Sequence, residues 1–218
     1  MTSRDWVIKF LKEKGAANAA EPLGTDFIAI DPKNDDSGEE LPPFTAGIVS
    51  SKKVTDEVLA PLLESDTAFD FVVNIPKDSI WTGAGITRAE SEGLGWGGIA
   101  ELLSAMYSKQ IRGFQKKEYQ FVLRGLQQHT NVAQIFRPFD RKLEIHRHDY
   151  DPLTVVLVHE YELTGEHVRH ARELYGGFSD VLKTNPNGGI SGNASEVAGG
   201  LGAQVHQWGG FLGRLNRK

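Results

Sequence analysis

The stretch DPLTVVLVHEYELTGEHVRHAREL, residues 151–174, decides the fold class that we expect for this chain. After Pro152 the chain runs as a short apolar segment rich in β-branched residues, which predicts a strand. Thr164 then stands where a helix N-cap is favoured, and Glu166 falls in the first turn, where a carboxylate interacts well with the helix dipole. A strand that leads into a helix in this way is typical of an α/β fold.

The first half of the chain contains a similar stretch. PPFTAGIVSS (42–51) again predicts a strand after a proline, and KVTDEVLAPLLES (53–65) predicts a helix with Thr55 as its N-cap. Thr55 and Thr164 are 109 positions apart. Further pairs recur at nearly the same spacing: Val7 with Tyr119, Phe10 with Val122, Leu11 with Leu123, Pro76 with Pro186, Asp70 with Asp180, and Trp96 with Trp208 in LGWGGIAELL (94–103) and HQWGGFLGRL (206–215).

This recurrence predicts an internal duplication. We expect an α/β fold of two similar lobes, residues 1–108 and 114–218, each a small mixed sheet flanked by helices. Each lobe should run helix, strand, strand, helix, strand, helix, short strand, helix. The joint should lie near MYSKQIRGFQKKE (106–118), a basic, linker-like stretch. The alternative is that two unrelated α/β segments share this order by default.

Composition narrows the class of protein. The chain has 218 residues, of which 39% are hydrophobic and 24% charged, as in a soluble globular protein. It has no cysteine, which excludes disulfides, thiolate metal sites and a cysteine nucleophile. No run approaches the roughly 18 apolar residues of a membrane helix, and the start lacks the apolar core of a signal peptide. We therefore expect a cytoplasmic protein with no membrane partner. With a net charge of −5, nucleic-acid binding requires a local basic surface.

The second half carries the candidate chemistry, including all seven histidines. Alternation along two predicted strands places Lys142, Glu144, His146 and His148 on one face, and Val156, Val158, Glu160 and Glu162 on one face of the next. An antiparallel pairing is expected to gather Glu144, His146, Glu160 and Glu162. Clustered carboxylates suit a hard divalent cation, because Mg²⁺ takes oxygen ligands. The first half has SSKK (50–53) at the corresponding place.

The second half, from VVLVHEYELTGEHVRHAREL (155–174) through KTNPNGGISGN (183–193) to HQWGGFLGRL, resembles the restriction-endonuclease-like PD-(D/E)xK superfamily, and is most similar to its Mrr-type branch. The order of elements carries the resemblance: helix, strand meander with an acid, strand ending in Glu-x-Glu, helix, strand, small-residue helix, short strand, helix. The first half resembles the family more faintly, as a degenerate copy.

The resemblance implies metal-dependent cleavage of phosphodiesters, with Mg²⁺ or Mn²⁺ as cofactor and DNA as partner. Glu144 or Asp140 would be the first acid and Glu160 the second, so that Glu144 and Glu160 bind the metal. Glu162 takes the position usually held by lysine, which departs from the family pattern. Lys183 or Lys142 would then supply the lysine.

Two functions follow from this resemblance. One is a nuclease of DNA processing or defence, with catalysis confined to the second lobe. The other is a catalytically inactive pseudo-nuclease that acts as a protein- or nucleic-acid-binding scaffold in a larger assembly. The acidic balance of the chain and the incomplete acid, acid and lysine set favour the scaffold.

Plainer interpretations stand beside each candidate. Glu160 and Glu162 are also explained as solvated charges or as ion-pair partners of Arg147, Arg169 or Lys142. His146 and His148 suit a transition metal together with His159 or Glu144, or remain without a ligand. His167, Arg169, His170 and Arg172 would form a basic helix face that touches phosphates or is merely solvated. The glycines and asparagines of residues 183–193 suit an anion site or simple turns.

Overall fold

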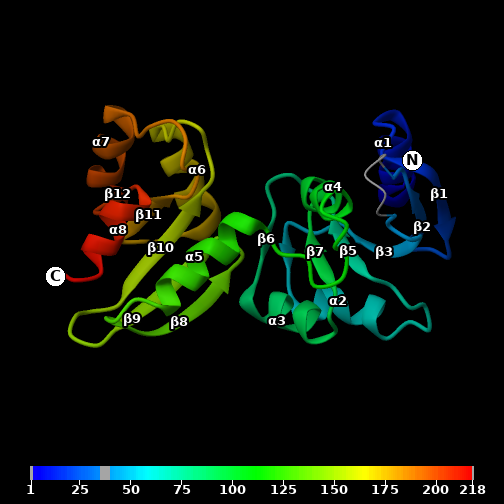
Figure 1. Ribbon diagram of the computed structural model, residues 1–218, viewed down its shortest axis with the longest axis horizontal. Coiled ribbons are helices and arrows are strands. Elements are labelled where there is room, and N and C mark those ends of the chain that lie inside the picture. The colour runs from blue at the N-terminus through cyan, green and yellow to red at the C-terminus, as the bar shows by residue number, and fades with distance from the viewer. Residues whose placement is uncertain (1, 35–39, 218) are drawn as a thin grey trace. The chain divides into compact units, whose positions relative to one another are not determined.

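The computed structural model describes residues 2–34 and 40–217 and divides the chain into two compact units, residues 1–115 and 116–218 (Figure 1). We call them the first unit and the second unit. Each is an α/β unit built around one five-stranded mixed sheet with helices on its faces, as expected.

The sheet of the first unit has the order β1-β2-β3-β5-β7. Its strands are β1 (Ala17–Leu23), β2 (Phe27–Pro32), β3 (Phe44–Val49), β5 (Phe71–Asn74) and β7 (Gly95–Gly97). The pairings β1 with β2 and β2 with β3 are antiparallel, whereas β3, β5 and β7 run parallel. Two short strands, β4 (Lys53–Val54) and β6 (Ile80–Trp81), form a separate parallel pair.

Four helices cover this sheet. On one face lie α1 (Ser3–Glu13) and α4 (Ile99–Tyr107), whose apolar side chains share a core with β2, β3 and β5. On the other face lie α2 (Asp56–Leu63) and α3 (Gly83–Ser91), which enclose a second core. Three of these helices, α1, α2 and α3, start after a threonine whose hydroxyl caps the helix, as at Thr55, which accepts from the Val58 N–H.

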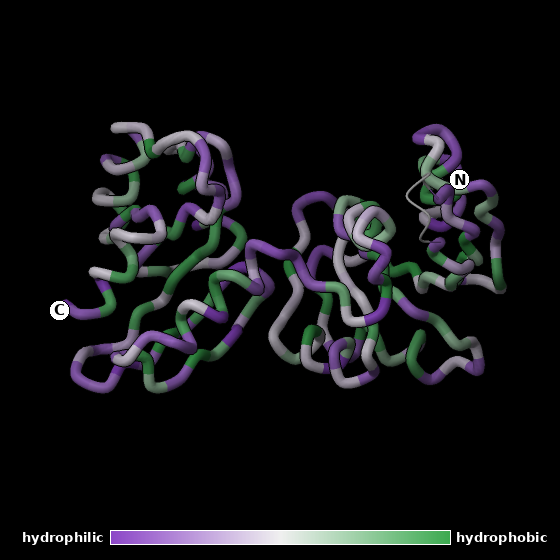
Figure 2. Tube along the Cα trace, viewed as in Figure 1, coloured by the Kyte–Doolittle hydropathy of each residue, from purple (hydrophilic) through white to green (hydrophobic). Residues whose placement is uncertain are grey.

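The second unit repeats this architecture. Its sheet has the order β12-β11-β10-β9-β8, formed by β8 (Val132–Phe139), β9 (Lys142–Arg147), β10 (Leu153–Val158), β11 (Asp180–Lys183) and β12 (Gln204–His206). The pairings β8 with β9 and β9 with β10 are antiparallel, and β10, β11 and β12 run parallel. Figure 2 shows β10 as one of the most apolar stretches of this unit, consistent with its central place in the sheet.

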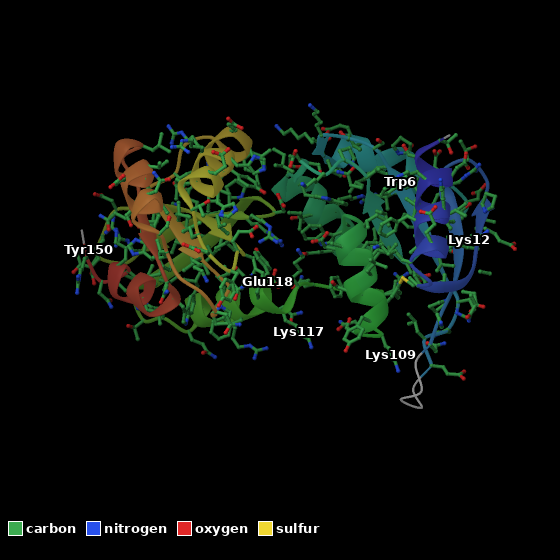
Figure 3. The ribbon with its side chains drawn as sticks, turned by 90° about the horizontal axis from the view of Figure 1, so that it is seen from above. Trp6, Lys12, Lys109, Lys117, Glu118 and Tyr150 are labelled. Atoms are coloured by element: carbon green, nitrogen blue, oxygen red, sulfur yellow. The ribbon has the colours of Figure 1, made fainter. Side chains whose placement is uncertain are left out.

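The helices of the second unit also lie on both faces. α5 (Lys117–Gln127) and α8 (Trp208–Arg214) share a core with one face of the sheet. Figure 3 places Lys117 and Glu118 at the start of α5. α6 (Gly165–Tyr175) contacts β10 and packs against α7 (Gly192–Gly200). None of the helices within residues 2–34 and 40–217 has both the length and the apolar character needed to cross a membrane.

From the third strand of each unit onward, the backbone hydrogen bonds of the two units match residue by residue. The Ser179 N–H donates to the Thr154 carbonyl as Asp70 N–H donates to Thr45, and Gln204 N–H donates to Ser179 as Gly95 N–H donates to Asp70. The parallel bridge between Leu163 and Ile190 likewise matches the pair Val54 and Trp81. All these positions differ by 109.

Before the third strand of each unit, corresponding residues are 115 positions apart. Ile28 pairs with Ala46 and Leu143 with Val155, and the buried helix residues Val7 and Leu11 correspond to Val122 and Leu126. The change from 115 to 109 falls in the connection to the third strand. That connection has eleven residues in the first unit (33–43) and five in the second (148–152).

These spacings correct the predicted pairing at 112. Trp96 is the middle residue of β7, whereas Trp208 is the first residue of α8, so the two Trp-Gly-Gly sequences occupy different places in the two units. Val7 corresponds to Val122 and not to Tyr119, and Asp70 corresponds to Ser179 and not to Asp180. The two similar α/β units are confirmed, while their origin by duplication stays a prediction.

The joint lies within the stretch 106–118, as predicted, and part of this stretch is packed into the first unit. Ile111 and Phe114 are buried in the core of the first unit. The Arg112 guanidinium donates to the carbonyls of Phe69 and Glu92 and forms an ion pair with Asp70 at 3.2 Å. The chain passes from one unit to the other between Gln115 and Lys116, so residues 109–115 belong to the first unit.

Candidate functional site

The strongest candidate for a site is the edge of the second sheet at which β10 and β11 end, because α/β folds commonly bind ligands beyond the carboxyl ends of parallel strands. Two loops meet there, residues 159–163 and 184–191. The Leu163 N–H donates to the Gly189 carbonyl, and the Ser191 N–H donates to the Leu163 carbonyl. The ring of His159 lies 2.9 Å from the Thr184 hydroxyl. The loops therefore form one connected surface above the sheet.

Glu160 and Glu162 lie in the first of these loops and are exposed. The prediction that they continue the strand is wrong, since β10 ends at Val158. Its neighbours explain why. β11 ends at Lys183, opposite Val158, and β9 begins at Lys142, opposite Val156. Beyond Val158 no ladder remains to keep the chain extended.

Glu144 lies away from this edge, so the predicted gathering of four side chains is also wrong. The register places Glu144 opposite Thr154, four residues before the end of β10. At about 3.3 Å per residue, that end lies roughly 13 Å further along the strand. Glu144 instead contacts its neighbour on the same face, His146, with 2.6 Å between Oε1 and Nε2. Glu144 and Glu160 are therefore not two ligands of one ion in this register.

Lys183 is the last residue of β11, and its side chain is buried. Its amine donates to the carbonyls of Asn185 and Asn187 in the loop that follows. Burial lowers the pKa of Lys183 below its usual value. The corresponding residue of the first unit is Asn74, which is also buried. Its side-chain amide accepts a hydrogen bond from the Ser51 N–H and donates one to the Ser51 carbonyl. Both residues fasten a loop to the sheet edge.

Asp140 and Lys142 come together around Tyr175, near the same edge. The Tyr175 hydroxyl lies 3.4 and 3.5 Å from the two Asp140 carboxylate oxygens, and the Lys142 amine donates to the Tyr175 carbonyl at 2.7 Å. Burial, with the Asp140 carboxylate adding to it, raises the pKa of Tyr175. The Leu157 N–H donates to the Arg141 carbonyl, so the turn that holds Asp140 flanks the end of β10.

The histidines considered as metal ligands are dispersed. His146 lies on β9 beside Glu144, His148 is exposed in the connection from β9 to β10, and His159 contacts Thr184. Figure 3 marks that connection by Tyr150. Within residues 2–34 and 40–217, no three His, Cys, Asp or Glu side chains are grouped so that they could hold a metal ion.

On α6 the basic residues have different surroundings. The His167 ring accepts from the Thr164 N–H at 3.2 Å and so belongs to the helix cap. Arg169 is exposed and forms an ion pair with Glu166 at 3.3 Å. The side chain of Arg172 stacks on the Phe178 ring. The predicted ion-pair partners of Glu160 and Glu162 were Arg147, Arg169 and Lys142. Each of them makes its contacts with other residues.

One buried polar cluster was not predicted. Asp180 is fully buried; its carboxylate contacts His206 Nε2 at 2.7 Å and Arg214 Nε at 3.4 Å, and accepts from the Ser179 hydroxyl at 2.7 Å. Burial alone raises the pKa of Asp180, but the bonds from His206 and Ser179 and the Arg214 charge outweigh it and hold this pKa below its usual range. The cluster joins β11, β12 and α8.

Arg147, also buried, extends this polar region. Its guanidinium donates to the Asp151 carbonyl and to the carbonyls of Arg214, Leu215 and Arg217 at the end of α8. The sequence signals were an aspartate that opens a buried strand and an arginine that falls on the same face of β9 as the buried Leu143 and Ile145. Nothing in their spacing indicated that both would meet the last helix.

The two units differ in charge. Lysines and arginines number 11 in the first unit against 18 aspartates and glutamates, and 13 in the second against 11, so the excess charges are −7 and +2. All seven histidines add to the second. Comparisons with known protein families, with curated proteins and with solved structures find no match to this chain.

Proposed function

We propose that the chain binds nucleic acid through its second unit, which acts as a pseudo-nuclease of the restriction-endonuclease-like type. The observation that carries this proposal is the register of β9 and β10, which holds Glu144 opposite Thr154 while Glu160 lies in a loop beyond the strand. A restriction-endonuclease-like site needs its two acids at one metal ion. Binding without cleavage is the function that this separation favours.

Two further observations support the proposal. The second unit has a positive excess charge in a chain of net charge −5, which favours an anionic partner for this half. Each unit also runs helix, three-stranded meander, helix, parallel strand, helix, parallel strand, helix, the order on which the resemblance rests. Scaffolding of a larger DNA-processing or defence assembly in the cytoplasm belongs to the same proposal.

The test is a binding experiment on the full chain with fluorescently labelled single- and double-stranded DNA, in chelator and then in Mg²⁺ or Mn²⁺. We expect binding that weakens as salt rises, because phosphate contacts release counterions. The DNA should remain uncut with either metal. Absence of binding to both forms at low salt would overturn the proposal.

Cleavage by the second unit is a second candidate, favoured by the position of Asp140. The turn that holds Asp140 flanks the end of β10, because the Arg141 carbonyl accepts from the Leu157 N–H. Leu157 lies three residues before Glu160. In this version Asp140 replaces Glu144 as first acid, and Glu160 with Glu162 would hold Mg²⁺ or Mn²⁺, with Lys183 or Lys142 supplying a positive charge. The metal would activate a water for attack on phosphorus.

The decisive pair of variants for cleavage is Asp140→Asn and Glu160→Ala, with the exposed Glu196→Ala on α7 as the control. Nuclease activity that needs a divalent metal, and that the first two variants abolish while the control retains it, would establish this second candidate. Intact substrates in wild-type protein with Mg²⁺ and with Mn²⁺ would exclude it and leave the binding role.

A further inference from the structure

The β8–β9 hairpin of the second unit has one face turned away from α5 and α8. Leu143 and Ile145 of β9 and Ile135 of β8 pack into the core with those helices. Because side chains alternate along a strand, their neighbours point to the opposite face. These are Gln134, Phe136, Lys142, Glu144 and His146, which we call the hairpin face.

An aromatic pair occupies the middle of the hairpin face. Phe136 is 42% exposed, so that much of its ring is open to solvent. The His146 ring meets it nearly edge-on, with the ring centroids 5.0 Å apart, and the His146 side chain is 39% exposed. The register sets this geometry, since Phe136 pairs with Glu144 and Gln134 with His146. The two rings thus meet edge to face on a partly exposed sheet surface.

Cations border one end of this pair. Lys142 lies on the same face, and its amine gives one of three donors to the Tyr175 carbonyl, which leaves two for another acceptor. Arg172 of α6 is close enough to Lys142 that its charge, after burial, contributes to lowering the pKa of Lys142. Glu144 is engaged by His146 at 2.6 Å. An anionic group would therefore approach at the Lys142 end.

The equivalent face of the first unit lacks these features. At the spacing of 115, Gln134 and Phe136 correspond to Ala19 and Glu21, and His146 corresponds to Asp31. The pairs Ala19 with Asp31 and Glu21 with Ala29 repeat the register of the second unit. Lys142 and Arg172 correspond to Phe27 and Leu63. The backbone is thus shared, while at these positions the second unit has rings and cations that the first lacks.

We propose that the hairpin face is a platform for single-stranded nucleic acid, on which a base stacks against Phe136 with His146 at its side while Lys142 and Arg172 meet the backbone phosphates. Stacking on exposed sheet aromatics beside cations is a common means of binding single strands, because every base offers a flat face. This inference rests on the proposed function and assigns it a surface that begins at Lys142, near the edge where β10 and β11 end, and extends away from that edge along the hairpin.

Fluorescence anisotropy of a labelled oligothymidylate tests it, with the full chain as wild type, Phe136→Ala, Phe136→Tyr and Phe121→Ala. Loss of one base stack should weaken binding by about tenfold or more in Phe136→Ala. Phe136→Tyr should bind like wild type. Phe121, 58% exposed on α5 and in tilted ring contact with Trp208, is the matched control and should have little effect. Circular dichroism checks that each variant is folded.

The outcomes separate the two proposals. If wild type binds no nucleic acid, the proposed function fails. If wild type binds the oligothymidylate and Phe136→Ala binds it equally well, the platform is overturned while the proposed function stands. Binding to duplex alone, with no affinity for the single strand, would also overturn the platform and retain the proposed function.

Discussion

The two units attach their last helix to the sheet by different means. In the first unit the positions that correspond to Asp180, His206 and Arg214 are Phe71, Gly97 and Ala105, and α4 rests on an apolar core around the buried Phe71. In the second unit the same three positions form a buried ion cluster that joins β11, β12 and α8. One topology thus accommodates two kinds of attachment.

The order of elements therefore does not determine the chemistry of their contacts. Apolar burial tolerates changes of side chain, with a cost set by the area and volume lost. A buried ion cluster is less tolerant, because removal of one partner leaves an uncompensated charge in a place of low polarity. The second unit should therefore be the more sensitive of the two to single polar substitutions and to acid.

The largest effect is expected for Asp180→Asn, which keeps the shape of the side chain but leaves Arg214 without its counter-charge. We expect the free energy of unfolding of the second unit to fall by about 3 kcal/mol. Hydrogen exchange measured on peptides from α8, with peptides from α4 as internal reference, reports this change. The exposed Asp149→Asn is the control, and equal protection of α8 in both variants would show that the ion cluster does not hold α8 to the sheet.

Acid should act through the same carboxylate. The pKa of Asp180 is lowered in the folded protein, so its contribution to stability is complete well above pH 4, roughly the pKa of an unfolded aspartate, and is lost as pH falls through the lowered folded value. Between neutral pH and about pH 3, α8 should lose more exchange protection than α4. The difference between wild type and Asp180→Asn should shrink over this range, and a constant difference would contradict the assignment.

Gly188→Ala tests a difference between the two units in the loops that follow β5 and β11. A Cβ at Gly188 would lie 1.8 Å from the Tyr161 carbonyl oxygen, and φ of 72° is already unfavourable for alanine. We expect the free energy of unfolding of the second unit to fall by about 2 kcal/mol. The first unit has Ser79 at the equivalent place and so does not share the requirement for glycine. Gly189→Ala meets no atom within 4 Å and serves as the control. Urea denaturation of both variants measures the effect.

The smallest expected effect is a gain in the first unit. Lys109, just beyond the end of α4, has φ of 56°, a conformation that favours glycine (Figure 3). Lys109→Gly should stabilise the first unit by about 1 kcal/mol. Ser108→Gly, one residue earlier in right-handed conformation, should instead destabilise it slightly. Thermal denaturation of the two variants distinguishes these signs, and a loss in Lys109→Gly would contradict the reasoning.

Much of the fold could be predicted from apolar patterns. The strand at 153–158 and the helix capped by Thr164 are where they were expected. The first strand of each sheet, β1 and β8, was missed, because only Ala20 of β1 is buried and β8 has no fully buried residue. An edge strand buries too little surface to leave an apolar signature.

The candidate site was less predictable, since it depends on where partners end and not on local composition. Glu160 keeps the parity of the strand residues before it, but the ladder stops at Val158. The Trp-Gly-Gly sequences misled for a similar reason: they match in letters, while backbone hydrogen bonds set the true correspondence three residues away. Hydrogen bonds between distant residues, such as those of Asp180 with His206, leave no trace in spacing.

The constant spacing of 109 has a practical meaning for how this chain can change. Residues 45–98 and 154–207 are segments of equal length that begin and end at matching hydrogen bonds, with no gap between them. Either segment could therefore replace the other without a change in chain length. An exchange by recombination, in nature or in the laboratory, would move a whole set of loops from one sheet to the other without altering the length of any connection.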